Sequence, residues 1–139
     1  MPKESTTPDL EELGRRLLEA ANRRDFDAGM RFFAPDAVWR PAGGYTFEGR
    51  AAIRGFFEEL ASSFDDLPFE FEEFLDLGNG VAFSVTILTG RPVGSSGELR
   101  VRYASVGVWT DGVIERSNEY TKNFDEARAA AERLAASRG

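Results

Sequence analysis

The chain has 139 residues and a formal net charge of −7, and 42% of its residues are hydrophobic. This length suits one domain with one core, and the acidic balance argues against binding to nucleic acid or to an anionic membrane surface. Cysteine and histidine are both absent, which excludes disulfides, thiolate nucleophiles, imidazole bases and the metal sites built from these residues. We therefore expect no cofactor and no metal, and any catalysis has to use carboxylate, hydroxyl, Tyr, Arg or Lys groups.

The N-terminal residues 1–8 are polar, and we expect them to be flexible, with residues 9–139 forming a single domain. The first residues lack the apolar segment of a signal peptide, and no apolar run approaches the length of a membrane span. These features predict a cytoplasmic protein. Arginine far outnumbers lysine, which hints at a bacterial source.

Four helices are expected where apolar residues recur at helical spacing. Asp9 can cap the first helix and Asp125 the last. A short second helix begins at Asp25 and ends before Pro35, with Phe33 in its apolar stripe. The third has the clearest apolar periodicity in the chain. Apart from the short one, the expected ranges are 9–22, 50–64 and 126–137.

Between and after these helices, β-branched and aromatic residues alternate with polar ones, which is typical of strands. The pairs at 79–80 and 111–112 are Asn-Gly and Asp-Gly, which favour hairpin turns. The alternation slips at residues 72–73, which predicts a β-bulge. The expected strands are 37–40, 45–47, 69–77, 81–90, 98–109 and 113–121.

This order of elements predicts an α+β fold with a bent antiparallel sheet. We expect the sheet to wrap around the three helices of the N-terminal half and to form an open cone, with the last helix at the C-terminus. The mouth of such a cone is a natural site for a small molecule.

Three strings carry a resemblance to a known family. ANRRDFDAGMRFFAPDAVW (21–39), FEGRAAIRGFFEEL (47–60) and VWTDGVIERSNEY (108–120) resemble the SnoaL-like branch of the nuclear transport factor 2-like superfamily, which has the ketosteroid isomerase-like, cystatin-like cone fold. The resemblance implies that fold and a hydrophobic pocket. It does not name a reaction, because the fold hosts isomerases, hydrolases, cyclases and proteins that only bind.

The catalytic groups of two enzyme classes in the superfamily are not retained. The three positions used by ketosteroid isomerases fall at Leu17, at Pro41 or Arg40, and at Ser105. None of these side chains can take the corresponding role. The resemblance therefore does not imply steroid-isomerase chemistry.

Limonene-epoxide hydrolases use an Asp–Arg–Asp set. The Arg position falls at Thr86, the first Asp position at Leu88 and the second at Glu119, so one carboxylate of the three groups remains. SnoaL-type cyclases use a single acidic base, a part that Glu119 or Glu115 could play. Glu119 is the candidate catalytic residue, as an acid or base in the pocket. The alternative is a glutamate that stays hydrated at the mouth or pairs with an arginine.

The resemblance also places a set of residues toward the pocket, and it leaves three functions open. The protein is an isomerase-, cyclase- or hydrolase-type enzyme acting on an apolar ligand, a non-catalytic ligand-binding protein, or an interaction module. The candidate ligand-binding residues are Trp39, Tyr45, Phe57, Thr86, Tyr103, Ser105, Trp109 and Ser117.

The strand at 81–90 can face the pocket in two ways. The family match turns Ser84 and Thr86 inward, which leaves Val81, Phe83 and Val85 on the outer face. A slip of one residue would reverse this, because side chains alternate with a period of two. If the match holds, the outer face is too apolar to be left bare, and we expect a homodimer through it.

Overall fold

The structure is a computed structural model that describes residues 9–139, so the predicted flexible segment 1–8 lies outside the described residues. Within residues 9–139, no helix has both the length and the apolar character that crossing a membrane requires. The elements are α1 (Leu10–Asn22), α2 (Phe26–Met30), β1 (Phe33–Arg40), β2 (Phe47–Glu48), α3 (Arg50–Ser62), β3 (Phe64–Asp66), β4 (Phe69–Asp76), β5 (Val81–Pro92), β6 (Leu99–Thr110), β7 (Val113–Tyr120) and α4 (Phe124–Arg138).

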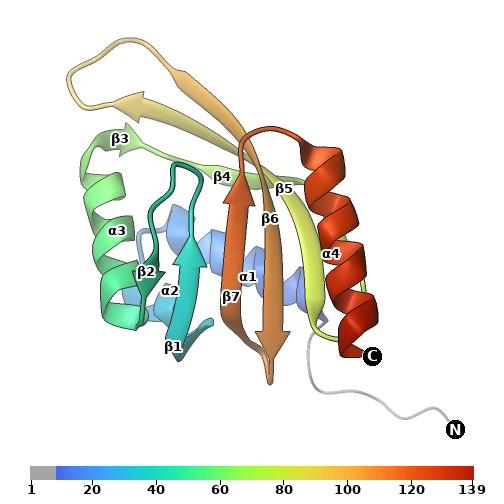
Figure 1. Ribbon diagram of the computed structural model, residues 1–139. Helices are drawn as coiled ribbons and strands as arrows, with labels where there is room; N and C mark the ends of the chain where they lie inside the picture. Colours follow the sequence, from blue (N-terminus) through green and yellow to red (C-terminus); the bar gives the residue numbers. More distant parts are fainter. Residues whose placement is uncertain (1–8) are drawn as a thin grey trace, which may run out of the picture.

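The strands form one open sheet in the order β2-β1-β7-β6-β5-β3, and β4 also pairs with β5 (Figure 1). The predicted α+β fold is confirmed. All pairs are antiparallel except β1 with β7, which run parallel. Parallel neighbours need a long crossover, and here the chain passes through β2, α3 and β3–β6 between the two strands.

The three helices of the N-terminal half cover one face of the sheet. Their buried residues Leu13, Met30 and Ile53 share one apolar cluster with Trp39 of β1 and Trp109 of β6. Helix α1 approaches β4 closely, because a Cβ atom at Gly14 would lie only 3.1 Å from the rings of Phe71 and Phe74. This close approach sets the depth of the space between α1 and the sheet.

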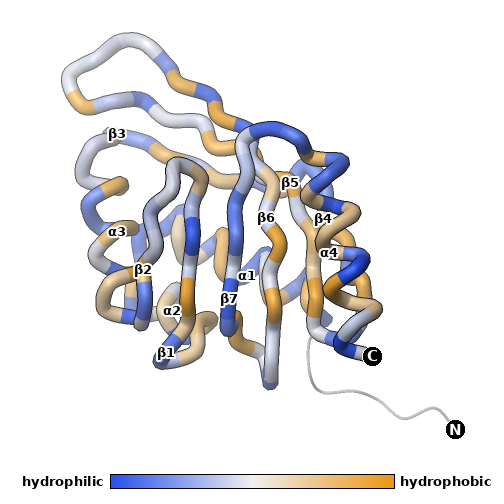
Figure 2. Tube along the Cα trace, viewed as in Figure 1, coloured by the Kyte–Doolittle hydropathy of each residue, from blue (hydrophilic) through white to orange (hydrophobic). Residues whose placement is uncertain are grey.

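The last helix covers the opposite face. Val81, Phe83 and Val85 of β5 form a second buried cluster with small residues of α4, among them Ala127 and Ala131. In Figure 2 the stretch of β5 beside α4 contains apolar residues, whereas β7 is mostly hydrophilic. Strand β5 therefore has the orientation that the family match predicts, with Ser84 and Thr86 on the face opposite α4.

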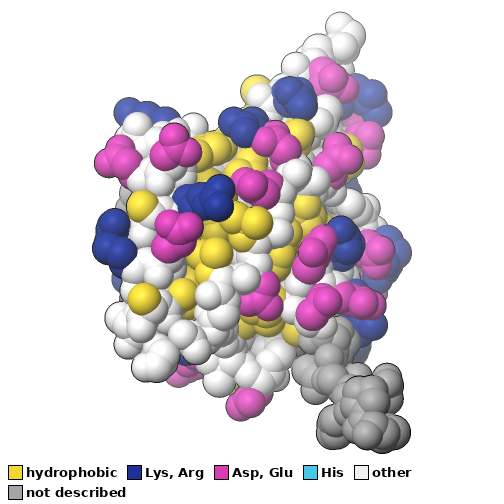
Figure 3. Space-filling view, turned by 90° about the vertical axis from the view of Figure 1, so that its right-hand side faces the viewer, with side chains coloured by type: hydrophobic (Ala, Val, Ile, Leu, Met, Phe, Trp, Pro, Cys, Tyr) yellow, Lys and Arg dark blue, Asp and Glu magenta, His cyan; other side chains and the backbone are white. Residues whose placement is uncertain are grey.

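The predicted homodimer was based on a bare outer face, and α4 of the same chain covers part of that face. Figure 3 shows that apolar side chains remain visible on the side of the molecule where α4 lies. The homodimer stays a prediction.

Several element ends differ from the sequence-based expectation. Phe33 begins β1 and pairs with Ile114 of β7, so it does not belong to α2, which ends at Met30. The β1–β7 register shifts between Phe33 and Val38, where Pro35 has no N–H to donate to the ladder. The chain after α3 forms the unexpected strand β3, whose residue Asp66 pairs with β5.

The start of the last helix also differs. Asp125 is not its cap, because the helix begins at Phe124 and its N-cap is Asn123, which has a left-handed backbone (φ 58°) and makes no side-chain cap bond. Asn tolerates this conformation better than most residues. Asp125 instead lies in the first turn, where its negative charge favours the helix N-terminus. The predicted bulge is confirmed, since the β4–β5 register shifts between Phe71 and Glu73.

The packing of α4 is tested by placing a charge under it. Ala131 is fully buried against β5, whereas Ala136 on the same helix is exposed. Ala131→Glu should lower the free energy of unfolding by about 3 kcal/mol or more, because it buries a carboxylate without a partner. Ala136→Glu is the matched control and should change it by less than about 0.5 kcal/mol. Urea denaturation measures both, and equal losses would contradict this packing.

Candidate functional site

A cavity of about 100 Å³, which we call the main cavity, lies between α1, α3 and the inner face of the sheet. Its lining is mainly apolar and aromatic, and it contains no Lys or Arg among the described residues. Eight residues predicted for the site line it. These are Trp39, Phe57, Thr86, Tyr103, Ser105, Trp109, Ser117 and Glu119.

The polar groups of the main cavity form rows across three neighbouring strands. Ser84 of β5 is opposite Ser105 of β6, and Ser105 is opposite Glu119 of β7. In the next row, Thr86 is opposite Tyr103. Side chains opposite each other on antiparallel strands have Cβ atoms about 5 Å apart. The sheet register thus gathers three hydroxyls, a phenol and a carboxyl into one part of the wall.

Glu119 is held by a single side-chain donor. Its Oε2 atom accepts a hydrogen bond of 3.0 Å from Nε1 of Trp39, and within residues 9–139 no other hydrogen bond and no ion pair to this carboxyl is found. Solvent still reaches part of the residue. Burial raises the pKa of Glu119 to about 8, and the Trp39 bond opposes this only in part. The carboxyl is thus mostly protonated at neutral pH.

Tyr103 is the second titratable group in the cavity. Burial raises the pKa of Tyr103 well above its usual range, the nearby charge of Glu119 raises it further, and a hydrogen bond with Thr86 opposes the rise. Tyr103 therefore keeps its proton at physiological pH. Both groups can donate a hydrogen bond to an oxygen atom placed between them.

An aromatic cluster fixes the indole that binds Glu119. The ring of Trp39 stacks on Phe57, with centroids 4.7 Å apart and planes 14° apart, and it meets the edge of Phe56 at 4.8 Å. These contacts determine where Nε1 points. The position of the Glu119 carboxyl thus depends on α3 as well as on β1.

Two residues considered from the sequence lie elsewhere. Tyr45 does not line the main cavity, and 68% of its surface is exposed, because it belongs to the loop before β2. Glu115 is exposed and bonds to the Thr110 hydroxyl across the β6–β7 hairpin. Within residues 9–139, no group of three or more acidic side chains is placed to hold a metal ion.

Other lining residues were not predicted. Gly14, Leu17, Leu18 and Ala21 of α1 line the main cavity, and their spacing of three, four and seven residues is the signal that could have identified them. Ser84, which the family match turned inward but which was not among the candidate ligand-binding residues, also lines the cavity. The Trp39–Glu119 bond joins residues 80 positions apart and has no local signal in the sequence.

The comparisons with known proteins agree with this architecture. The family model described as SnoaL-like domain matches residues 14–117, whereas no curated protein matches the chain. A protein from Catenulispora acidiphila with a ketosteroid isomerase-like fold, solved in complex with trimethylamine, is 18% identical with a TM-score of 0.73, and the match covers 85% of this chain and 88% of that one.

Two further structures are proposed polyketide cyclases. The protein from Sinorhizobium meliloti is 26% identical with a TM-score of 0.67, and the match covers 81% of this chain and 96% of that one. The protein from Xanthomonas campestris is 21% identical with a TM-score of 0.65, covering 87% and 95%. At 18% and 21% identity, the first and third of these likenesses show the fold alone.

The raised pKa of Glu119 predicts a pH-dependent stability. The folded state holds the Glu119 proton up to about pH 8, whereas the unfolded chain releases it near pH 4.5. The stability contributed by the protonated form is therefore present below about pH 4.5 and is lost as pH rises through about 8. Glu119→Gln cannot ionise, so its Tm relative to the natural protein should rise by roughly 10 °C between pH 5 and pH 9.

Thermal unfolding monitored by circular dichroism measures this difference. Glu115→Gln is the matched control on the same strand, since Glu115 is exposed, and its Tm difference from the natural protein should be the same at both pH values. A Glu119→Gln difference that does not change with pH would contradict the assignment of a buried, mostly protonated carboxyl.

Proposed function

The chain belongs to the SnoaL-like domain family, and we propose that it binds a neutral, largely apolar small molecule through a carbonyl or hydroxyl oxygen. The observation that carries this proposal is the Glu119 carboxyl, which lies in a mainly apolar cavity and has the Trp39 N–H as its one side-chain partner within residues 9–139. A protonated carboxyl in such a place is a strong hydrogen-bond donor. Tyr103 and Ser105 supply further donors to the same oxygen.

The charge of the main cavity narrows the class of ligand. An anionic ligand would find no Lys or Arg in the described lining, and it would lie beside a carboxyl that can itself become negative. Burying such a charge without a partner is costly. The aromatic walls, which include Trp39, Phe57 and Trp109, favour flat or aliphatic apolar groups.

The same groups support a catalytic role. A carboxyl with a pKa of about 8 exists in both forms near neutral pH, which is what a general acid and base requires. In its ionised form Glu119 can remove a proton from the carbon next to a ligand carbonyl, while Tyr103 and Ser105 donate to the enolate oxygen that forms. The proton then returns from Glu119 to carbon. This chemistry begins a cyclase or isomerase reaction.

The aromatic lining favours a second candidate ligand, an alkylammonium cation. The Glu119 carboxyl, which has no ion-pair partner among the described residues, and the aromatic side chains of the lining together suit a positively charged amine. A structural relative with 18% identity was solved with trimethylamine. In this case the ionised Glu119 would be the counter-ion of the ligand.

Two probes separate the candidates, 2-pentanone as the neutral ketone and tetramethylammonium as the cation. Both can be followed by tryptophan fluorescence, because Trp39 and Trp109 line the main cavity. Ketone binding should weaken as pH rises through about 8, because Glu119 loses the proton that it donates. Glu119→Gln should still bind the ketone through its amide N–H, without this pH dependence.

The cation predicts the reverse result, with binding that strengthens as pH rises and that Glu119→Gln abolishes. Glu115→Gln is the control for both probes and should behave as the natural protein does. If neither probe binds at any pH, the proposed ligand-binding function is wrong.

Catalysis is tested by exchange of the hydrogens next to the ketone carbonyl for deuterium. The natural protein should accelerate this exchange for 2-pentanone in D₂O by at least about tenfold over Glu119→Gln, because removal of the general base costs one to several orders of magnitude. Proton NMR measures the rate directly. Equal rates with intact ketone binding would show a binding protein without acid–base catalysis.

A further inference from the structure

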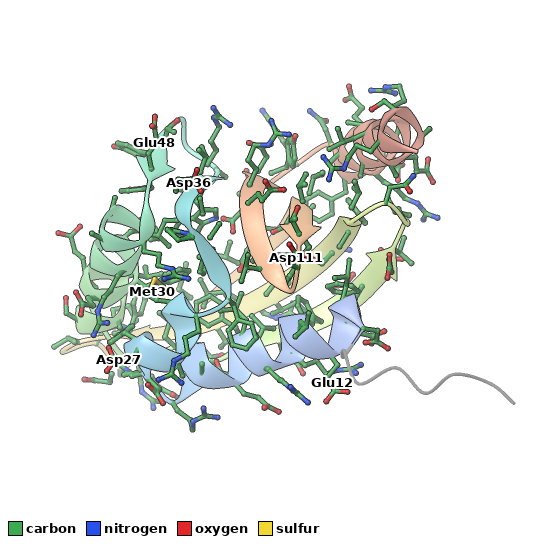
Figure 4. All side chains as sticks on the ribbon, turned by 90° about the horizontal axis from the view of Figure 1, so that it is seen from below. Glu12, Asp27, Met30, Asp36, Glu48 and Asp111 are labelled. Atoms are coloured by element: carbon green, nitrogen blue, oxygen red, sulfur yellow. The ribbon has the colours of Figure 1, made fainter. Side chains whose placement is uncertain are left out.

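A second cavity of about 50 Å³, which we call the side cavity, lies beside the main cavity. It is enclosed by the end of α1, by α2 and α3, and by the β3–β4 segment. In the view from below (Figure 4), Met30 of α2 points into the molecule, whereas Asp27 of the same helix points outward. Met30 joins Phe26, Leu60, Ala61, Leu67 and Phe69 in an apolar lining.

The polar residues at the side cavity are Asn22, Arg24, Asp25 and Asp66. Asp25 accepts from the N–H of Ala28 and Asp66 pairs with Arg91, while Asn22 and Arg24 hold the rim together. The Asn22 amide donates to the carbonyl of Phe69 and accepts from its N–H. The Arg24 guanidinium donates to the carbonyls of Ala61 and Phe64. These bonds tie the end of α1 to α3 and to the edge of the sheet. The side cavity therefore offers a ligand mainly apolar contacts.

The two cavities share part of their walls. Leu17 and Ala21 of α1 and Phe57 of α3 line both. Leu17 and Ala21 are four residues apart, so they lie one above the other on the same face of α1. Phe57 is held by its stack on Trp39, with ring centroids 4.7 Å apart. Ala21 presents only a methyl group, which leaves the half-buried Leu17 side chain as the mobile part of this partition.

We propose that the two cavities are two compartments of one ligand site. The oxygen-bearing end of the ligand lies in the main cavity near Glu119, and an unbranched apolar arm passes between Leu17 and Phe57 into the side cavity. The proposal rests on the proposed function and makes its substrate class more specific. The ligand is then a carbonyl or hydroxyl compound with a linear alkyl chain. The proposal requires the Leu17 side chain, which lines both cavities, to change rotamer and open the passage.

The affinity of a series of methyl ketones tests this inference. From 2-pentanone to 2-nonanone the head is constant and the chain grows by single methylene groups. Each methylene removed from water raises affinity by about fourfold, so the longest ketone should bind at least about tenfold more tightly than the shortest. Tryptophan fluorescence titration at about pH 6, where Glu119 is protonated, gives the dissociation constants.

Two substitutions act on the side cavity alone, since Leu60 and Ala61 line it and do not line the main cavity. Ala61→Leu fills the side cavity and should remove most of the gain that 2-nonanone has over 2-pentanone. Leu60→Ala enlarges it and should preserve or increase that gain. Ala52→Leu adds the same atoms to an exposed position of α3 and should leave the gain unchanged. Circular dichroism confirms that each variant is folded.

The outcomes separate this inference from the proposed function. If 2-pentanone binds and the longer ketones gain nothing, or if a folded Ala61→Leu keeps the natural gain, the two-compartment site is wrong and the binding function stands. If Ala61→Leu does not fold, an affinity for 2-nonanone that falls in Leu60→Ala also overturns the inference. If no ketone binds to the natural protein, both proposals fail together.

Discussion

The structure depends on one constraint, the alternation of side chains along β5. Successive residues of a strand point to opposite faces, and β5 uses both faces fully. Val81, Phe83 and Val85 pack under α4, while Ala82 and Ser84 line the main cavity. A shift of one residue would expose the apolar set to the ligand and bury hydroxyls under α4 without partners. The register of β5 therefore determines both which residues pack under α4 and which residues line the main cavity.

Local patterns in the sequence predicted most of the elements, because spacing of apolar residues and turn residues are local signals. The sequence-based prediction was wrong where a contact between distant parts of the chain determines where an element begins or whether it forms. The start of β1 at Phe33 depends on its pairing with Ile114, and the short strand β3 exists because β5 extends to Pro92 and pairs with it. The fold class needed only the order of elements, whereas the ends of elements needed partners from elsewhere in the chain.

Most residues proposed for the site from the sequence line the main cavity, whereas the hydrogen bond between Trp39 and Glu119 could not be predicted. Alternation and the family resemblance identified Glu119, Tyr103 and Ser105, which the β5–β6–β7 ladder brings together. The bond between Trp39 and Glu119 depends on the parallel β1–β7 register, in which Trp39 pairs with Ser117. No pattern in the sequence specifies that register. Tyr45 lies outside the main cavity, because a loop residue has no neighbouring strand to fix the direction of its side chain.

Because α4 covers the apolar outer face of β5, the order in which the chain is synthesised has a consequence for folding. Asn79, in the β4–β5 turn, donates to the carbonyl of Ala135 and accepts from Arg138 through its own carbonyl. During synthesis the strands emerge from the ribosome before α4. The apolar outer face of β5 therefore stays exposed until α4 packs against it. During this interval the exposed apolar surface is prone to aggregation. The small side chains of α4 let it dock without reshaping the sheet.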